Sequence, residues 1–258
     1  MKTITMQVLK GFMHNQKKII YSIYMKIKLN FKNKLGRKFK VGLIEQISIT
    51  IFKLKYNLPD RVLEDIFKID HVTINRIINR ISLYISKFNL NSKLDNEFYI
   101  VDSTTLRIGK DKTKNSYSGY KHHHGIKFQV IVNDKSIIQN ISKAYPSSIH
   151  DKKLFICEYK DLTNKIDKSL KILGDKGYAG LGEYQLSIPI KRNEREYKKD
   201  KNLAKTNNQL ISRKRIKIEH VFAYMKNFRI LQRLNYYKMN KIELFFQSIA
   251  NIYNLSKI

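Results

Sequence analysis

The chain has 258 residues, which suits one large domain or two smaller ones, and 42% are hydrophobic, enough to bury a core. Its 51 Lys and Arg against 21 Asp and Glu give a formal net charge of +30. This excess argues against a protein that binds only an acidic small molecule, and it indicates nucleic acid as the partner.

The cellular compartment can be predicted from sequence features that the chain lacks. Cys157 is the only cysteine, so the chain can form no internal disulfide and no cysteine metal cage. No apolar run approaches the roughly 18 residues of a membrane span. The N-terminus also lacks an apolar segment followed by a small-residue cleavage site. We therefore expect a cytoplasmic protein with no membrane partner.

The chain begins with a strongly basic stretch. Residues 1–44 carry 11 Lys and Arg and no acid. Apolar residues interrupt the charge, as in IIYSIYMKIKLNF, which argues against a disordered tail. We expect residues 1–40 to form a basic N-terminal segment, an amphipathic helix or an arm along the DNA backbone. The alternative is that its apolar side chains pack on the rest of the chain.

Three helices are expected next, over residues 41–57, 58–68 and 72–88. One face of the third is apolar and consists of Ile74, Ile77, Ile78, Ile81 and Ile85. The opposite face carries Asn75, Arg76, Asn79 and Arg80. Asn and Arg are the side chains that pair with adenine and guanine edges in the major groove. The pattern predicts an all-α helix-turn-helix DNA-binding domain over residues 41–90, with an ordinary three-helix module as the alternative.

The spacing of apolar residues changes from that of helices to that of strands after the polar linker at residues 90–97. Strands are expected at 97–102, 125–134, 135–145, 168–175 and 186–191. Helices are expected over 147–162, over about 206–234, and at the C-terminus. Three strands, a helix, a strand, a further short strand and a long helix form the element order of the RNase H-like α/β fold. We predict this fold for residues 95–258.

Three acidic residues stand in positions that suit metal chemistry. Asp102 follows the run EFYIV, and Asp175 follows KILG, so each is expected to end a strand. Glu219 lies on the later helix, in one stripe with Arg215 and Lys226 at 100° per residue. Each residue alone is usually a turn, cap or surface residue. Together they predict a Mg²⁺ site for phosphodiester cleavage, because carboxylates are hard oxygen ligands.

At this point the sequence resembles a known family. The strings VDST, YSGYKHHHGIKFQVIVN, PSSIHD and LGDKGY, with an Arg-x3-Glu-x6-Lys helix, are similar to DDE transposases of bacterial insertion sequences. The nearest branch is the one related to insertion sequence five and to Harbinger nucleases. The resemblance implies that Asp102, Asp175 and Glu219 are catalytic and hold two Mg²⁺ ions, for which Mn²⁺ can substitute. It also implies a nucleoid-associated bacterial enzyme.

The resemblance extends to partners and accessory residues. It implies binding of double-stranded terminal inverted repeats and target DNA, hydrolysis and strand transfer, and a dimer or higher oligomer during synapsis. Arg215 and Lys226 would contact phosphates. His150 and Asp151 match the family's HD pair, and Asp151 stays open as an accessory to Asp175 or a replacement for it. The alternative functions are a non-transposing metal-dependent nuclease and a catalytically decayed DNA-binding protein.

Overall fold

A computed structural model describes residues 11, 16–30, 41–88, 96–109, 116–119, 121–162, 169–232, 234 and 237–257. The chain divides into two compact units. The helical unit comprises residues 1–89, 226–233 and 237–258, and the sheet unit comprises residues 90–225 and 234–236. The C-terminal helix, which we expected to belong with residues 95–258, therefore groups with the N-terminal helices instead.

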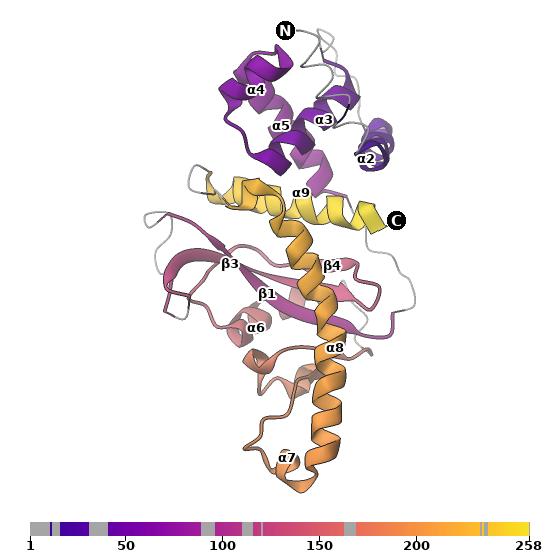
Figure 1. Cartoon of the computed structure of the whole chain (residues 1–258), viewed down its shortest axis with the longest axis vertical. Helices are drawn as coiled ribbons and strands as arrows, with labels where there is room; N and C mark the ends of the chain where they lie inside the picture. The colour runs from indigo at the N-terminus through magenta and orange to yellow at the C-terminus, as the bar shows by residue number, and fades with distance from the viewer. Residues whose placement is uncertain are drawn as a thin grey trace. The chain divides into compact units, whose positions relative to one another are not determined.

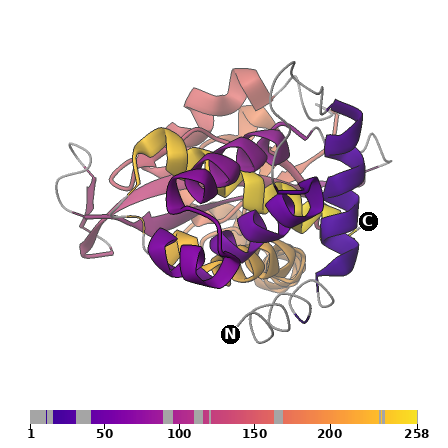
Figure 2. The same ribbon diagram turned by 90° about the horizontal axis from the view of Figure 1, so that it is seen from above.

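The helical unit contains α2 (Lys17–Asn30), α3 (Leu43–Tyr56), α4 (Asp60–Phe67), α5 (His71–Ser86), η3 (Arg229–Gln232) and α9 (Met239–Lys257) (Figures 1 and 2). The Asp70 side chain starts α5 by accepting hydrogen bonds from the amides of Val72 and Thr73, at 3.0 and 3.1 Å. The five isoleucines of α5 are all buried, and the helix packs against α3 and α9. The apolar face expected from the sequence is therefore confirmed.

Helix α2 lies inside the expected basic segment. Its Ile20, Ile23 and Ile27 are buried, and it packs against α3 and α9. Residues 17–30 are therefore part of the helical core and not a free arm, because their apolar stripe has neighbours to pack on. The rest of the basic segment, residues 1–10, 12–15 and 31–40, lies outside the described residues.

The sheet unit is built on one mixed sheet. The central β1 (Tyr99–Arg107) pairs antiparallel with β3 (His123–Asn133) and parallel with the short β6 (Ile172–Leu173). Strand β6 pairs parallel with β7 (Leu186–Ser187). Three short strands pair antiparallel with β3, namely β2 (Tyr117–Ser118), β4 (Ile138–Ile141) and β5 (Tyr145–Pro146). The predicted α/β class is confirmed.

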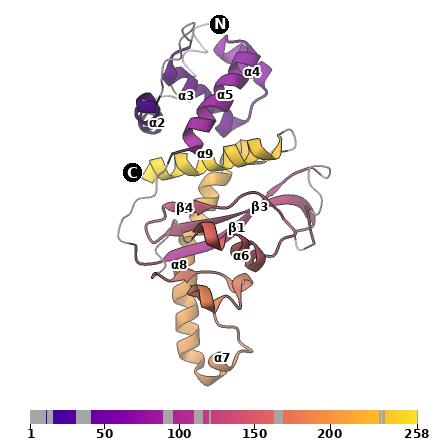
Figure 3. The ribbon, with the colours of Figure 1, turned by 180° about the vertical axis from the view of Figure 1, so that it is seen from behind.

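Two helices, α6 (Asp151–Leu162) and α8 (Lys201–Lys226), lie on opposite faces of this sheet (Figures 1 and 3). Phe155 of α6 packs with Tyr99 and Val101 of β1, whereas Arg215 of α8 bonds to Asp102. Successive strand side chains point to opposite faces, so neighbouring residues of β1 serve different helices. The shorter helices of the unit are η1 (Lys176–Tyr178), η2 (Gly182–Tyr184) and α7 (Arg195–Lys199).

Several elements differ from expectation in extent. Strand β1 continues past Asp102 to Arg107, because β3 offers a pairing partner as far as Gly125 and β-branched residues suit the pleat. Helix α6 begins at Asp151 rather than at residue 147, and β6 and β7 have two residues each. None of the described helices is long and apolar enough to cross a bilayer.

Candidate active site

Asp102 lies in the middle of β1, on the face toward α8. Its Oδ2 accepts a hydrogen bond from Arg215 Nη2 at 3.0 Å, and its Oδ1 accepts one from the Ser103 amide at 2.7 Å. Burial raises the pKa of Asp102 above its ordinary 3.8, and the charge of Asp175 adds to the rise, while Ser103 and Arg215 oppose it. The carboxylate therefore sits where an added cation would stabilise its charge.

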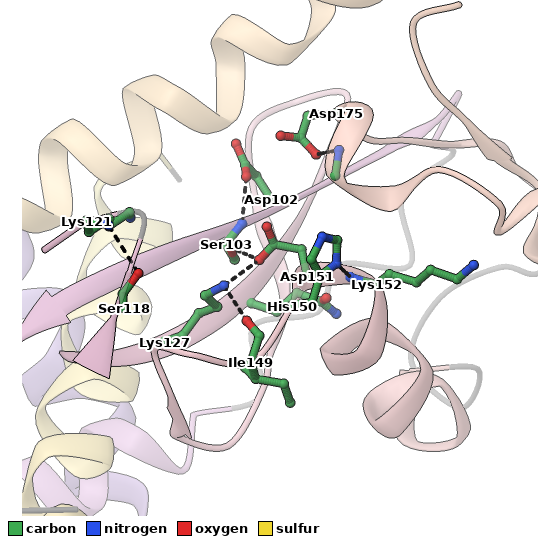
Figure 4. A network of polar contacts seen from close by, with 12 residues as sticks. Asp102, Ser103, Ser118, Lys121, Lys127, Ile149, His150, Asp151, Lys152 and Asp175 are labelled. Carbon is green, nitrogen blue, oxygen red and sulfur yellow. Dashed lines mark hydrogen bonds and ion pairs between the residues drawn. The ribbon is translucent and has the colours of Figure 1, made fainter. Parts of the chain in front are cut away.

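Asp175 reaches the same region because β6 is short. On the side of β1 this strand pairs with Tyr99 and Ile100, and its pairing with β1 ends at Leu173. Asp175 then caps η1, its Oδ1 accepting a hydrogen bond from the Gly177 amide at 2.8 Å. Its carboxylate lies beside β1 close enough to act on the charge of Asp102 (Figure 4).

A third aspartate, Asp151, is the first residue of α6 and is anchored to β1 and β3 (Figure 4). Its Oδ1 accepts hydrogen bonds from Ser103 Oγ at 2.5 Å and from Lys127 Nζ at 3.0 Å. Its Oδ2 lies 3.4 Å from the point where a Cβ would stand on Gly177, and Asp175 Oδ1 lies 2.9 Å from that point. One oxygen of Asp151 and one of Asp175 therefore lie close to the same side of Gly177.

The hydroxyl of Tyr178 lies among these carboxylates. The side chain has no exposed surface, and its hydroxyl has no hydrogen-bond partner among the described residues. Burial raises the pKa of Tyr178 well above 10.0, and the charges of Asp151, Asp102 and Asp175 raise it further. An unpaired buried hydroxyl is unfavourable, so a partner that the described side chains do not supply would stabilise it.

Glu219 does not join this group. It lies one helical turn after Arg215 on α8, and its side chain is exposed. Within the described ranges, neither Glu219 nor Asp151 forms with Asp102 and Asp175 a group whose ligand atoms all lie within 4.8 Å of one another. The structure thus places Asp102 near Asp175 with Arg215 as its counter-ion, whereas Asp151 bonds to Ser103, whose side chain points to the opposite face of β1.

Residues 101–254 match the protein family described as DDE superfamily endonuclease, and this range spans more than half of the chain. The chain belongs to this family. The predicted family and enzyme class are therefore confirmed, and DDE endonucleases generally use divalent metal ions. A protein from Microchaete diplosiphon named "Probable transposase for insertion sequence element IS702" is 29% identical over 243 residues, which cover 86% of this chain and 84% of the relative. No solved structure matches the chain.

The carboxylates of this DDE endonuclease fit a divalent cation. Asp102, Asp175 and Asp151 offer oxygen donors, which hard cations such as Mg²⁺ prefer. Arg215 and Lys127 neutralise two of the three charges, so the group retains a net negative charge. The unpaired Tyr178 hydroxyl is consistent with a bound ion or its water.

The predicted accessory and phosphate-binding residues differ in their contacts and in their exposure to solvent. His150 precedes α6, and its Nδ1 accepts a hydrogen bond from the Lys152 amide at 3.3 Å, as a helix cap does. Arg215 is partly buried against Asp102, so it is engaged inside the endonuclease rather than free for phosphate. Lys226 is exposed at the end of α8.

The four predicted base-reading residues of α5 also divide into two kinds. The Asn75 amide donates to Asp60 Oδ2 at 2.9 Å, and Arg80 Nη2 donates to Gln46 Oε1 at 2.5 Å. These contacts hold both side chains inside the helical unit. Arg76 and Asn79 are exposed, although the Asn79 amide also donates to Asn75 Oδ1 at 2.8 Å.

Sequence reasoning missed four residues of the site, namely Ser103, Lys127, Gly177 and Tyr178. Three of them belong to the strings VDST and LGDKGY that carried the family resemblance. Lys127 had a signal of its own, since it is a lone charge between apolar residues of β3. A charge at such a position needs a partner, and that partner is Asp151.

Proposed function

We propose that the protein is the transposase of an insertion sequence. It would bind the double-stranded terminal inverted repeats, hydrolyse the phosphodiester at each element end, and join the freed 3′-hydroxyl to target DNA. The observation that carries this proposal is the convergence of Asp102 and Asp175 beside β1 in a DDE endonuclease with a net charge of +30. The name of the Microchaete relative supports transposition over simple cleavage.

The roles of the residues follow from their positions. Bound Mg²⁺ ions would activate the attacking oxygen and stabilise the leaving oxygen of the phosphodiester. We assign Asp102 and Asp175 as metal ligands and Glu219 of α8 as the third acidic residue. Arg215 holds Asp102 in place and balances its charge in the metal-free protein. Lys226 is left as an exposed cation for phosphate contact.

We assign the sheet unit to the RNase H-like fold and residues 41–90 to a helix-turn-helix domain. In support, β4, β3 and β1 are antiparallel neighbours, and β6 and β7 continue the sheet in parallel. Helices α4 and α5 are joined by a tight turn, and α5 presents Arg76 and Asn79 to solvent. The protein would work at the nucleoid, as a dimer or larger assembly when two element ends are paired, and within the insertion sequence five and Harbinger branch.

The test is incubation of the purified protein with its flanking repeat DNA and Mg²⁺, scored for nicking at the repeat boundary. Asp102→Ala, Asp175→Ala and Glu219→Ala should each lose cleavage by several orders of magnitude and still shift repeat DNA in a gel. Metal ligands act on the transition state, whereas phosphate contacts hold the duplex. Glu196→Gln, which removes an exposed acid outside residues 41–90, serves as the control.

The outcomes separate the alternatives. Repeat binding without Mg²⁺-dependent nicking would favour a decayed DNA-binding protein. Nicking without strand transfer would favour a nuclease that does not transpose. Full cleavage by Glu219→Ala would remove that residue from the catalytic set.

A further inference from the structure

Asp151 is held by contacts from the sheet. Its Oδ1 accepts hydrogen bonds from Ser103 Oγ of β1 and Lys127 Nζ of β3, at 2.5 and 3.0 Å. Lys127 Nζ is fixed in turn by the Ile149 carbonyl, at 2.6 Å, and only 11% of its side chain is exposed. One oxygen of Asp151 is therefore fully engaged, which sets the direction of the other (Figure 4).

The second oxygen, Asp151 Oδ2, lies near Gly177, as does Asp175 Oδ1. A Cβ on Gly177 would stand 2.9 Å from Asp175 Oδ1 and 3.4 Å from Asp151 Oδ2. Backbone conformation does not require glycine here, because Gly180 is the one described glycine with a positive φ. What the absent side chain provides at residue 177 is space between two carboxylate oxygens.

Tyr178 gives an independent indication that something binds in this space. Its hydroxyl is fully buried and has no partner within the described ranges, although it lies close enough to three carboxylates for their charges to raise its pKa. Among those carboxylates, the strongest electrostatic effect on the pKa of the hydroxyl, after burial itself, comes from Asp151. A buried donor with no protein acceptor beside an acidic space indicates a site for a ligand that brings oxygen atoms, such as a hydrated cation.

We propose that Asp151 Oδ2 and Asp175 Oδ1 are ligands of one divalent cation, with Gly177 leaving the room and Ser103 and Lys127 acting as positioning residues for Asp151. This inference deepens the proposed nuclease function and rests on it, since it adds Asp151 to the acidic residues of the same site. Hydrogen bonds that orient a ligating carboxylate typically change metal affinity by about 10–100-fold.

Replacing Lys127 distinguishes a role in positioning Asp151 from a purely electrostatic effect on cation binding. Its ammonium group touches Asp151, so removing the charge alone would make the site more negative and strengthen cation binding. If Lys127 instead holds Oδ1 so that Oδ2 faces Asp175, its removal weakens cation binding. Lys127→Met keeps most of the aliphatic stem and separates the two effects by the sign of the change.

The experiment titrates the full-length protein with Mn²⁺ in the absence of DNA, counts free Mn²⁺ by electron paramagnetic resonance, and records a melting curve for every variant. Asp151→Asn, Gly177→Ala and Lys127→Met should each weaken Mn²⁺ binding by about 10-fold or more. Two controls should leave it unchanged. In Gly182→Ala the added Cβ meets nothing within 4 Å, and Asp65→Asn removes an exposed acid outside the sheet unit.

Each outcome decides something. Unchanged Mn²⁺ affinity in folded Asp151→Asn and Gly177→Ala would overturn the proposal, and tighter binding by Lys127→Met would remove its positioning role. If Lys127→Met fails to fold, Ser103→Ala removes the other bond to Asp151 and should also weaken Mn²⁺ binding. Should Asp175→Asn lose Mn²⁺ binding and repeat nicking while Asp151→Asn keeps both, only this inference fails. A wild-type protein that neither binds Mn²⁺ nor nicks repeat DNA would refute the proposed function itself.

Discussion

The Tyr178 hydroxyl gives a prediction about stability that runs against the usual effect of a core substitution. Tyr178→Phe removes only the hydroxyl, which is buried and unpaired in the described structure, and keeps the ring that packs against Phe155. A buried hydroxyl without a hydrogen bond costs about 1–3 kcal/mol. The variant should therefore be more stable than the wild type by about that amount in the absence of metal. In a chain of this length, each kcal/mol corresponds to roughly 2–4 °C in Tm.

Calorimetry in the presence of a chelator is the assay, because it separates the melting of the sheet unit from that of the helical unit. Tyr159→Phe is the matched control, since Tyr159 belongs to the same aromatic cluster but is only partly buried. The control should change stability by less than about 0.5 kcal/mol. A lower Tm for Tyr178→Phe would refute the reasoning, because it would mean that the hydroxyl has a stabilising partner in the folded protein.

Three further predictions concern pH, DNA reading and the basic segment. Because burial raises the pKa of Asp102 above 3.8, Mn²⁺ affinity should fall as pH is lowered through that raised pKa. The contribution of Asp102 to the free energy of unfolding should have the opposite pH dependence and be lost as pH rises through the pKa of the folded state. A Tm difference between the wild type and Asp102→Asn that does not change with pH would contradict this prediction. Arg76→Ala should leave Tm unchanged and weaken binding to repeat DNA by about 1–3 kcal/mol, more than it weakens binding to random DNA. Equal losses on both DNAs in gel-shift titrations would show that Arg76 does not read base sequence. Arg80→Ala should instead lower Tm, because it breaks the hydrogen bond to Gln46. Ile23→Ala should destabilise the protein by about 2–5 kcal/mol in thermal melts and leave the salt dependence of DNA binding unchanged, because Ile23 is buried. An unchanged Tm would indicate that α2 is an arm and not part of the core.

The helices of the helical unit were predictable because their signals are local. The spacing of the isoleucines in α5 and the cap residue Asp70 lie within one helix, so a sequence window contains the whole argument. The α/β class followed for the same reason, from apolar runs separated by turns. The family was predictable from motifs such as VDST and LGDKGY, which lie within the residues 101–254 that match it.

The composition of the active site was only partly predictable. Asp102 and Asp175 were identified from the apolar runs before them, and the structure places them close together. Glu219 was expected beside them from helical spacing, but spacing gives the face of a helix and not what that face meets. In the structure Arg215, one turn earlier, contacts Asp102, and Glu219 is exposed.

The sequence by itself determined the secondary structure of most of the chain, the charge that suits DNA, and the family of nucleases. Only the tertiary structure decided which carboxylates converge. Asp151 enters the site because Lys127 and Ser103 reach it from two paired strands, and because β6 ends early enough for Asp175 to turn toward it. These contacts join residues 24 and 48 positions apart in the chain. Their existence depends on strand register and pairing length, which pairing partners set and local sequence does not.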